Sequence, residues 1–193
     1  VAAALTTEKK NVGFVGGVNG PLIQKFEAGF KAGVEEIDPN IEIQTQYLSQ
    51  DDPQQGFENP AGGETAATGM YDNGADVVYH AAGKSGLGVF DAVQAAGEGN
   101  WAIGVDSDQW LTADKAQQPF ILTTMLKRID TAVFEYTEAI ERAQLAARPP
   151  KALPSVDTTP YRQRELTDMW HDIFEDRTQA ATSALQRGII QQR

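Results

Sequence analysis

The sequence YHAAGKSGLGVFDA, residues 79–92, contains a Gly-Lys-Ser triplet of the kind found in phosphate-binding loops. Such a loop requires another glycine five residues before the Gly of its Gly-Lys pair, but position 78 is a valine inside an apolar run. A serine nucleophile elbow requires a glycine two residues after the serine, and this chain has Leu87 there. We therefore expect neither phosphate binding nor serine catalysis, and we interpret Lys84 and Ser85 as incidental.

The glycines at positions 83, 86 and 88 do not match the spacing of a dinucleotide-binding fingerprint either. They open a predicted helix, where backbone N–H groups can face the oxygen atoms of a ligand. The simpler interpretation is that they only connect a strand tightly to a helix. Ligand contact by these three glycines and a purely structural role for them both stay open at this point.

Asp106 lies in the sequence GVDSDQ, directly after a short apolar run. A carboxylate at this position can accept two hydrogen bonds from a sugar diol, and such charge-assisted bonds are strong and directional. It could instead cap a loop or helix, although Asp108 is the better candidate for a cap. Two nearby carboxylates also allow a divalent cation, but no third ligand follows at suitable spacing. We predict no metal site.

Three other side chains could take part in binding. Lys127 follows a predicted strand and could donate to a ligand oxygen, pair with Asp106, or simply be solvated. Phe57 lies in a polar segment and could stack on a flat ligand or cover the edge of the core. His80 is predicted to be a hydrogen-bonded core residue rather than a ligand or a base. Since no nucleophile and base are paired, we predict no catalytic residues and a protein that is not an enzyme.

The elements that position these residues follow from alternating apolar runs and amphipathic segments. We predict strands at 11–17, 41–48, 75–82, 101–106 and 120–126, helices at 21–37, 64–72, 88–97 and 128–147, and a polar loop at 49–63. This alternation is typical of an α/β fold with a parallel sheet flanked by helices. Ligands of such sheets bind beyond the carboxyl ends of the strands, where all the candidate residues except His80 are expected.

Composition excludes several classes of function. The net charge of −11 makes binding to nucleic acid unfavourable. The sequence contains no cysteine, which removes disulfides, thiol catalysis and cysteine-ligated metals. We expect no cofactor, and no apolar run in the sequence is long enough to span a bilayer.

Several sequence blocks occur in an order that resembles a known family. They are GFVGG, KFEAGFKAGV, YDNGADVVYHAAG, GVFDAV, AIGVDSDQ and LTTMLKRIDTAVFE. Together they resemble the basic membrane protein, or PnrA-like, family over about residues 1–140. Members of this family are substrate-binding lipoproteins of ABC transporters that carry purine nucleosides. The resemblance implies a type I periplasmic-binding-protein fold, in which two α/β lobes close on a ligand.

The resemblance also implies that this chain is a fragment, one lobe plus returning segments. We interpret 1–8 as the end of a first-lobe helix, 9–126 as the α/β ligand-binding lobe and 127–147 as a long helix. Residues 148–160 form a proline-rich linker and 161–193 a helical tail, and both match the family poorly. Residues 49–55 are interpreted as an insertion.

The roles of the site residues follow from the same resemblance. Phe57 would stack on the purine base, Gly83 would lie against the ligand, Asp106 would hold the ribose hydroxyls, and Lys127 matches the family's lysine. The implied partners are a purine nucleoside and the permease subunits of an ABC transporter. The membrane would be reached only through a lipid anchor in a missing N-terminal part, at the extracytoplasmic face of the cell membrane. The alternative is a nucleoside- or sugar-sensing regulatory domain of the same fold.

Overall fold

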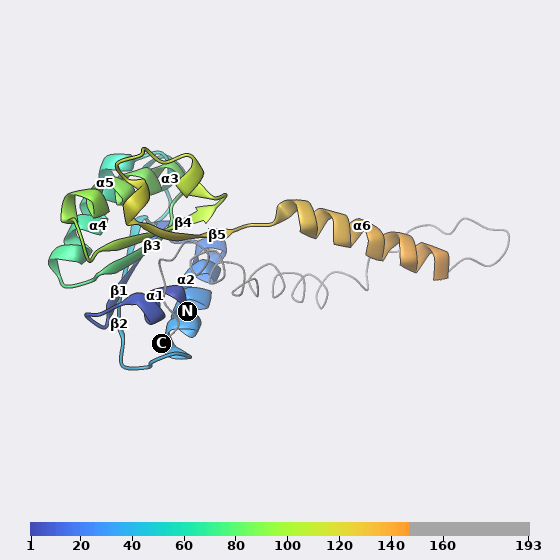
Figure 1. Cartoon of the computed structure of the whole chain (residues 1–193). Helices are drawn as coiled ribbons and strands as arrows, with labels where there is room; N and C mark the ends of the chain where they lie inside the picture. Colours follow the sequence, from blue (N-terminus) through green and yellow to red (C-terminus); the bar gives the residue numbers. More distant parts are fainter. Residues whose placement is uncertain (147–193) are drawn as a thin grey trace. The chain divides into compact units, whose positions relative to one another are not determined.

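A computed structural model describes residues 1–146, which contain a five-stranded parallel sheet flanked by helices (Figure 1). The strands are β1 (Asn11–Val18), β2 (Glu42–Ser49), β3 (Val77–Ala81), β4 (Trp101–Asp106) and β5 (Ile121–Leu126). Their order across the sheet is β2-β1-β3-β4-β5, and every neighbouring pair is parallel. This arrangement confirms the predicted α/β fold class. The chain divides after Leu126 into two compact units, the lobe that contains Val1–Leu126 and a second unit that begins at Lys127.

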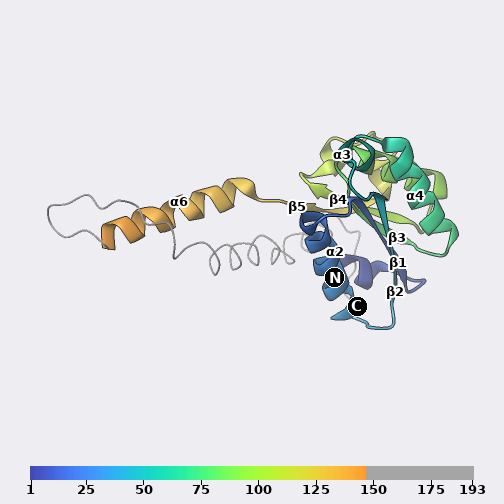
Figure 2. The ribbon, with the colours of Figure 1, turned by 180° about the vertical axis from the view of Figure 1, so that it is seen from behind.

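Helices cover both faces of the sheet within the lobe (Figures 1 and 2). One face carries α1 (Ala2–Thr6) and α2 (Pro21–Glu35), and the other carries α4 (Pro60–Asp72) and α5 (Gly86–Ala96). A short helix, α3 (Pro53–Phe57), follows β2, and the 3₁₀ turns are η1 (Gly83–Ser85), η2 (Gln109–Leu111) and η3 (Gln118–Phe120). The predicted polar loop at 49–63 is therefore wrong in part. Proline in the first turn of both α3 and α4 starts helices that the apolar periodicity did not reveal.

The larger core lies between the sheet and helices α4 and α5. Strand residues on this face pack against small and medium side chains of the two helices, and the buried set includes Val15, Val78, Ala102, Ile121, Ala66, Ala67, Met70, Val89, Phe90 and Val93. The helices themselves approach closely. A Cβ added at Gly63 would overlap the carbonyl oxygen of Ser85, and one added at Gly88 would overlap that of Pro60. Only glycine fits at these two positions.

The opposite face is packed mainly by aromatic rings. The ring of Tyr79 on β3 lies 5.6 Å from that of Phe14 on β1 and 5.4 Å from that of Phe30 on α2. Tyr47 on β2 meets Phe14 edge-on at 6.2 Å. Such tilted and edge-on contacts are favourable for aromatic pairs. The residues of β3, and all those of β1 except Val18, are consequently buried, as the nearly continuous apolar run at 75–82 indicates for β3.

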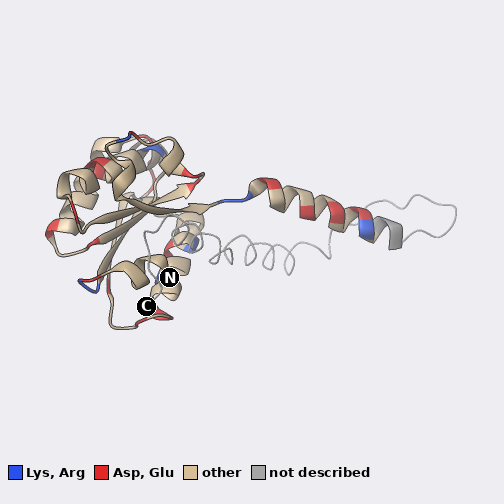
Figure 3. Ribbon diagram, viewed as in Figure 1, with Lys and Arg blue, Asp and Glu red and all other residues tan. Residues whose placement is uncertain are grey.

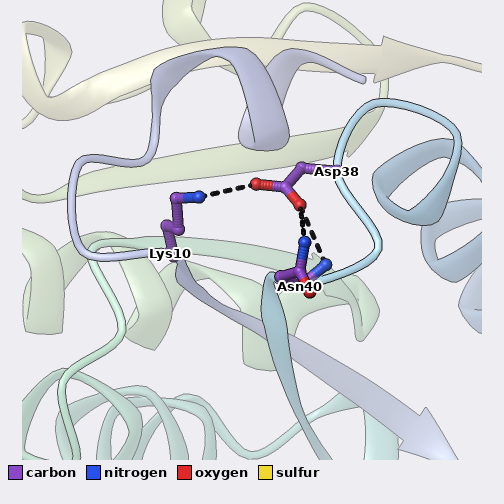
Figure 4. Close-up of polar contacts among 3 residues, drawn as sticks. All are labelled: Lys10, Asp38 and Asn40. Carbon is purple, nitrogen blue, oxygen red and sulfur yellow. Dashed lines mark hydrogen bonds and ion pairs between the residues drawn. The ribbon is translucent and has the colours of Figure 1, made fainter.

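Hydrogen bonds fix the amino edge of the sheet, where the strands begin. Asp76 is 2% exposed and accepts hydrogen bonds from Thr7 Oγ1 at 2.6 Å and from the N–H groups of Glu8 at 2.7 Å and Lys9 at 2.9 Å. Nearby, Figure 4 shows Lys10 and Asn40 converging on the carboxylate of Asp38. The hydrogen bond from Lys10 is the largest cause that lowers the pKa of Asp38, to about 2.

We predict that Asp76→Ala lowers the free energy of unfolding by about 2 kcal/mol, because two backbone N–H groups and a hydroxyl lose a largely buried acceptor. Urea unfolding followed by circular dichroism measures the change. Asp38→Ala is the matched control, and it should have a much smaller effect because its ion pair with Lys10 is exposed to solvent. Equal losses in the two variants would contradict the prediction.

The second unit contains α6 (Ile129–Ala146), which agrees with the predicted helix at 128–147. Its acidic residues stand out in Figure 3, and two of them form ion pairs, Asp130 with Arg128 and Glu138 with Arg142, both at 3.0 Å. Within residues 1–146 none of the helices has the length and apolar character needed to cross a membrane. The predicted linker at 148–160 and helical tail at 161–193 lie outside the described residues.

Candidate functional site

The carboxyl edge of the sheet, where the strands end, gathers most of the candidate residues. β1 and β3 end side by side, and β4 lies next to β3. Helices α2, α4 and α5 begin beyond these strand ends, so their free N–H groups lie at the same edge of the lobe. This is the position at which open parallel sheets bind ligands.

Helix α3 brings Phe57 to this edge. Asp52 caps the helix by accepting from the N–H groups of Gln54 at 2.8 Å and Gln55 at 3.4 Å, and Ser49 Oγ accepts from the N–H of Asp52 at 2.8 Å. The segment QDDP therefore starts the helix that ends at Phe57. Whether it is an insertion relative to the family stays a prediction.

The ring of Phe57 lies over two glycines at the ends of neighbouring strands. A Cβ added at Gly17 would come within 2.5 Å of Phe57 Cδ1, so nothing larger than glycine fits beneath the ring. A Cβ at Gly83 would lie 3.4 Å from Phe57 Cβ and 3.6 Å from Cδ1. Phe57 is half-buried, so the ring covers the backbone with one part and remains accessible with another.

The glycine-rich turn separates into an exposed and a buried part. Gly83 is exposed and has a φ of 55°, a left-handed conformation that favours glycine. Gly86 and Gly88 are buried, one against the ring of His80 and the other against the carbonyl of Pro60. Of the three glycines only Gly83 is exposed, and the simpler packing interpretation holds for the other two.

Lys84 and Ser85 have structural tasks, which corrects the interpretation that they are incidental. Ser85 is fully buried, and its Oγ accepts a hydrogen bond from the N–H of Asn59 at 2.9 Å. Lys84 forms an exposed ion pair with Glu58 at 2.7 Å. Both contacts join η1 to the connection between α3 and α4.

Asp106 occupies a strained turn at the end of β4. Its φ is 69°, and within residues 1–146 only Lys10 is another non-glycine residue with positive φ. The N–H of Ser107 donates to the carbonyl of Val105 at 2.9 Å, which closes a three-residue turn around Asp106. Left-handed conformations of this kind cost free energy and concentrate at functional sites. The carboxylate is exposed to solvent.

The charge of Asp106 affects the pKa of a neighbouring phenol, and a second carboxylate, Asp108, caps the turn that follows. Burial raises the pKa of the Tyr79 phenol on β3, and the charge of Asp106 raises it further. Asp108 caps η2 by accepting from the N–H of Trp110 at 3.3 Å, which confirms the predicted cap. Asp106 itself is not used as a helix cap.

His80 is buried beneath the site without hydrogen bonds. It is 0% exposed, its ring meets that of Phe90 edge-on at 5.3 Å, and neither ring nitrogen has a hydrogen-bond partner among the described residues. The prediction of a core residue is confirmed, but that of a hydrogen-bonded one is wrong. Burial lowers the pKa of His80 to about 4, and the side chain of Gln109 acts in the opposite direction.

We predict that His80 makes the lobe less stable in acid. A folded-state pKa of about 4 against 6.5 means that the unfolded chain binds a proton more readily, so stability is full above pH 6.5 and falls as the pH drops toward 4. The expected loss between pH 7 and pH 5 is about 2 kcal/mol. Asp38, with its pKa of about 2, titrates below this window.

Urea unfolding of the natural sequence and of His80→Leu at pH 7 and pH 5 measures this dependence. The variant should show a flatter profile, because its buried side chain no longer titrates. A profile in the variant as steep as that of the natural sequence would assign the acid sensitivity to other groups.

A comparison with known protein families shows which family the chain belongs to. A sequence model of the family described as "ABC transporter substrate-binding protein PnrA-like" matches residues 1–147. The chain belongs to this PnrA-like family. Membership confirms the resemblance seen in the sequence blocks, and it assigns the chain to the substrate-binding proteins of ABC transporters.

Curated relatives support the same assignment. The chain is 42% identical over 143 residues to the CD4+ T-cell-stimulating antigen of Listeria monocytogenes, covering 69% of this chain and 38% of that protein. It is 35% identical over 144 residues to the ABC transporter nucleoside-binding protein BmpA of Lactococcus lactis, covering 69% and 39%. It is 33% identical over 138 residues to basic membrane protein A of Borreliella burgdorferi, covering 71% and 37%. The chain thus spans less than half the length of these PnrA-like relatives.

Solved structures agree on the fold. A solute-binding protein of an ABC transporter from Conexibacter woesei matches with a TM-score of 0.56 at 22% identity, covering 74% of this chain and 43% of that one. A second solute-binding protein, from Aeropyrum pernix, matches with a TM-score of 0.55 at 26% identity, covering 74% and 40%. The α/β fold of the lobe is therefore that of ABC transporter solute-binding proteins.

The structure places Phe57 against Gly83, and it places Asp106 at the same edge of the sheet. Phe57 lies against Gly83 beyond β1 and β3, and Asp106 ends β4, the next strand of the sheet. Lys127 begins the second unit, and its role stays a prediction. Sequence reasoning missed Gly17 and Gln109. The glycine pair near the end of β1 was a signal for Gly17, whereas a glutamine three residues after the end of β4 carries no recognisable signal.

Proposed function

We propose that this protein captures a purine nucleoside and delivers it to the permease of an ABC transporter. The observation that carries the proposal is that the strained, exposed residue Asp106 and the half-buried Phe57 both lie at the carboxyl edge of the sheet. Membership of the PnrA-like family and the name of the Lactococcus lactis relative, a nucleoside-binding protein, support the choice of ligand.

The base of the nucleoside would stack on Phe57. The ring is held by Gly17 and Gly83, so it offers a preformed flat surface and loses little freedom when a ligand binds. Stacking removes apolar area from water, which is worth about 25 cal/mol per Å². A purine base presents a larger flat apolar surface to this ring than a ribose does, so Phe57 favours a ligand with a base.

The ribose would be bound by Asp106. Its two carboxylate oxygens can each accept a hydrogen bond from one hydroxyl of the 2′,3′-diol, and bonds to an ionised acceptor are the stronger kind. Gly83, which has no side chain, would let the ligand approach the end of β3. Lys127 would donate to a ligand oxygen or orient the carboxylate, as the family resemblance implies.

Closure of two lobes would complete the site. The chain spans 37–39% of the length of the relatives described above, so the second wall of the cleft would be supplied by a lobe outside this sequence. Leu22 and Leu87, in the first turns of α2 and α5, are both about half exposed at the carboxyl edge and would be covered by that closure. The closed protein would present itself to a permease at the extracytoplasmic face of the membrane, held there by a lipid anchor. It would bind and release its ligand unchanged and would not be an enzyme.

We predict that Asp106→Gly weakens adenosine binding at least about tenfold, because the diol loses its charged acceptor. The same change should raise the free energy of unfolding by about 1 kcal/mol, since glycine adopts a φ of 69° without strain. Isothermal titration and urea unfolding measure the two effects. Asp108→Gly is the control and should leave affinity unchanged. Unaltered adenosine affinity in Asp106→Gly would exclude the proposed role.

We predict that Phe57→Leu weakens adenosine binding about tenfold, because stacking of a base on an aromatic ring contributes about 1–3 kcal/mol. Phe57→Tyr keeps the ring and should bind adenosine like the natural sequence. Competition titrations with adenosine and with free ribose measure the effect on base and sugar separately. Retention of full adenosine affinity in Phe57→Leu would rule out stacking on this ring.

A further inference from the structure

The side chain of Gln109 turns back from η2 to the end of β4. Its Oε1 accepts a hydrogen bond from the N–H of Val105 at 2.7 Å, and the bond is partly buried. Because the peptide N–H can only donate, the oxygen of the carboxamide and not its nitrogen must face it. Gln109 thus contacts the backbone directly before Asp106.

The backbone C=O and the backbone N–H of Val105 both form hydrogen bonds that stabilise the turn around Asp106. The carbonyl of Val105 accepts from the N–H of Ser107 at 2.9 Å, and its N–H donates to Gln109 at 2.7 Å. Asp106 lies between these two bonds with a φ of 69°. A strained conformation persists only when its surroundings determine it, and these bonds are the contacts that do so here.

The carboxamide of Gln109 lies against Gly104 of β4. A Cβ added at Gly104 would lie 2.6 Å from Gln109 Oε1 and 2.8 Å from Thr124 Oγ1, so the absence of a side chain at position 104 lets the carboxamide approach. Thr124 is buried. The oxygen therefore reaches Val105 from a space enclosed by β4 and β5 rather than from solvent.

We propose that Gln109 is a positioning residue that holds the turn around Asp106 and so directs its carboxylate at the diol of the ligand. The proposal rests on the proposed function, because it takes Asp106 as the group that binds the sugar. In this role Gln109 acts through the backbone of the turn rather than by contacting the ligand. Its effect on binding should pass through Asp106 alone, which separates this role from a general contribution to stability.

The test measures the affinities of the intact protein for adenosine and for 2′,3′-dideoxyadenosine, which lacks both hydroxyls. Gln109→Leu removes the acceptor and should weaken adenosine binding about tenfold while leaving dideoxyadenosine binding unchanged. Gln109→Glu keeps an acceptor oxygen at the same distance along the side chain and should restore most of the adenosine affinity. In the Asp106→Ala background, Gln109→Leu should cause no further loss.

Gln118→Leu is the matched control in the same connection between β4 and β5. Gln118 donates to the carbonyl of Trp110 at 2.9 Å and makes no contact with Val105. Its loss should destabilise the connection without changing the preference for adenosine over dideoxyadenosine. Gly104→Ala provides a second route to the proposed effect, because the added Cβ would displace the carboxamide of Gln109. Gly104→Ala should reproduce the selective loss of adenosine affinity that is expected for Gln109→Leu.

Two results would overturn the proposal. One is an equal loss of affinity for both nucleosides in Gln109→Leu, and the other is a further loss of adenosine affinity in the Asp106→Ala background. Either result would make Gln109 a purely structural residue.

Hydrogen exchange tests the role of Gln109 independently of the proposed function. Gln109→Leu should accelerate exchange of the Val105 amide, whereas Gln118→Leu should not. If the natural sequence binds neither nucleoside, the proposed function is wrong. If exchange of the Val105 amide is unaltered in Gln109→Leu, the proposed positioning role of Gln109 is wrong as well.

Discussion

Burial of the parallel sheet on both faces is the constraint on which the rest of the lobe depends. Helices α4 and α5 cover one face and α2 covers the other, so the central strands can present polar groups only at their ends. The amino edge is fixed by Asp76 and by the pair of Lys10 and Asp38. The carboxyl edge is where the candidate residues Phe57, Gly83 and Asp106 lie, at the ends of the buried strands.

Much of the fold could be predicted because its causes are local in the sequence. Continuous apolar runs such as Val77–Ala81 predicted buried parallel strands, and the apolar spacing after Pro21 predicted α2. Helix α3 was missed because five residues started by Asp52 and Pro53 are too short for apolar periodicity to appear. The early start of α4 at Pro60 was missed for a related reason, since its first turn is rich in glycine and alanine.

The candidate site was harder to predict than the fold. Residue type and position after a strand were enough to select Phe57, Gly83 and Asp106, but the left-handed φ of Asp106 depends on contacts that form only in the folded lobe. Ser85 was judged incidental because its buried partner, the N–H of Asn59, lies 26 residues away in the sequence. His80 was expected to have hydrogen-bond partners, and only the packing of Gly86 and Phe90 around its ring shows that these are lacking within residues 1–146.

The contact between α4 and α5 has a mechanical consequence. At Gly63 and Gly88 the chain segments approach so closely that a methyl group at either position would overlap a backbone carbonyl oxygen of the other segment. The turn that carries Gly83 precedes one helix, and the residue pair Phe57 and Asn59 precedes the other. The backbone beneath the candidate site is therefore closely packed, which favours the proposed closure as a movement of this lobe as one body rather than as a rearrangement of its own loops.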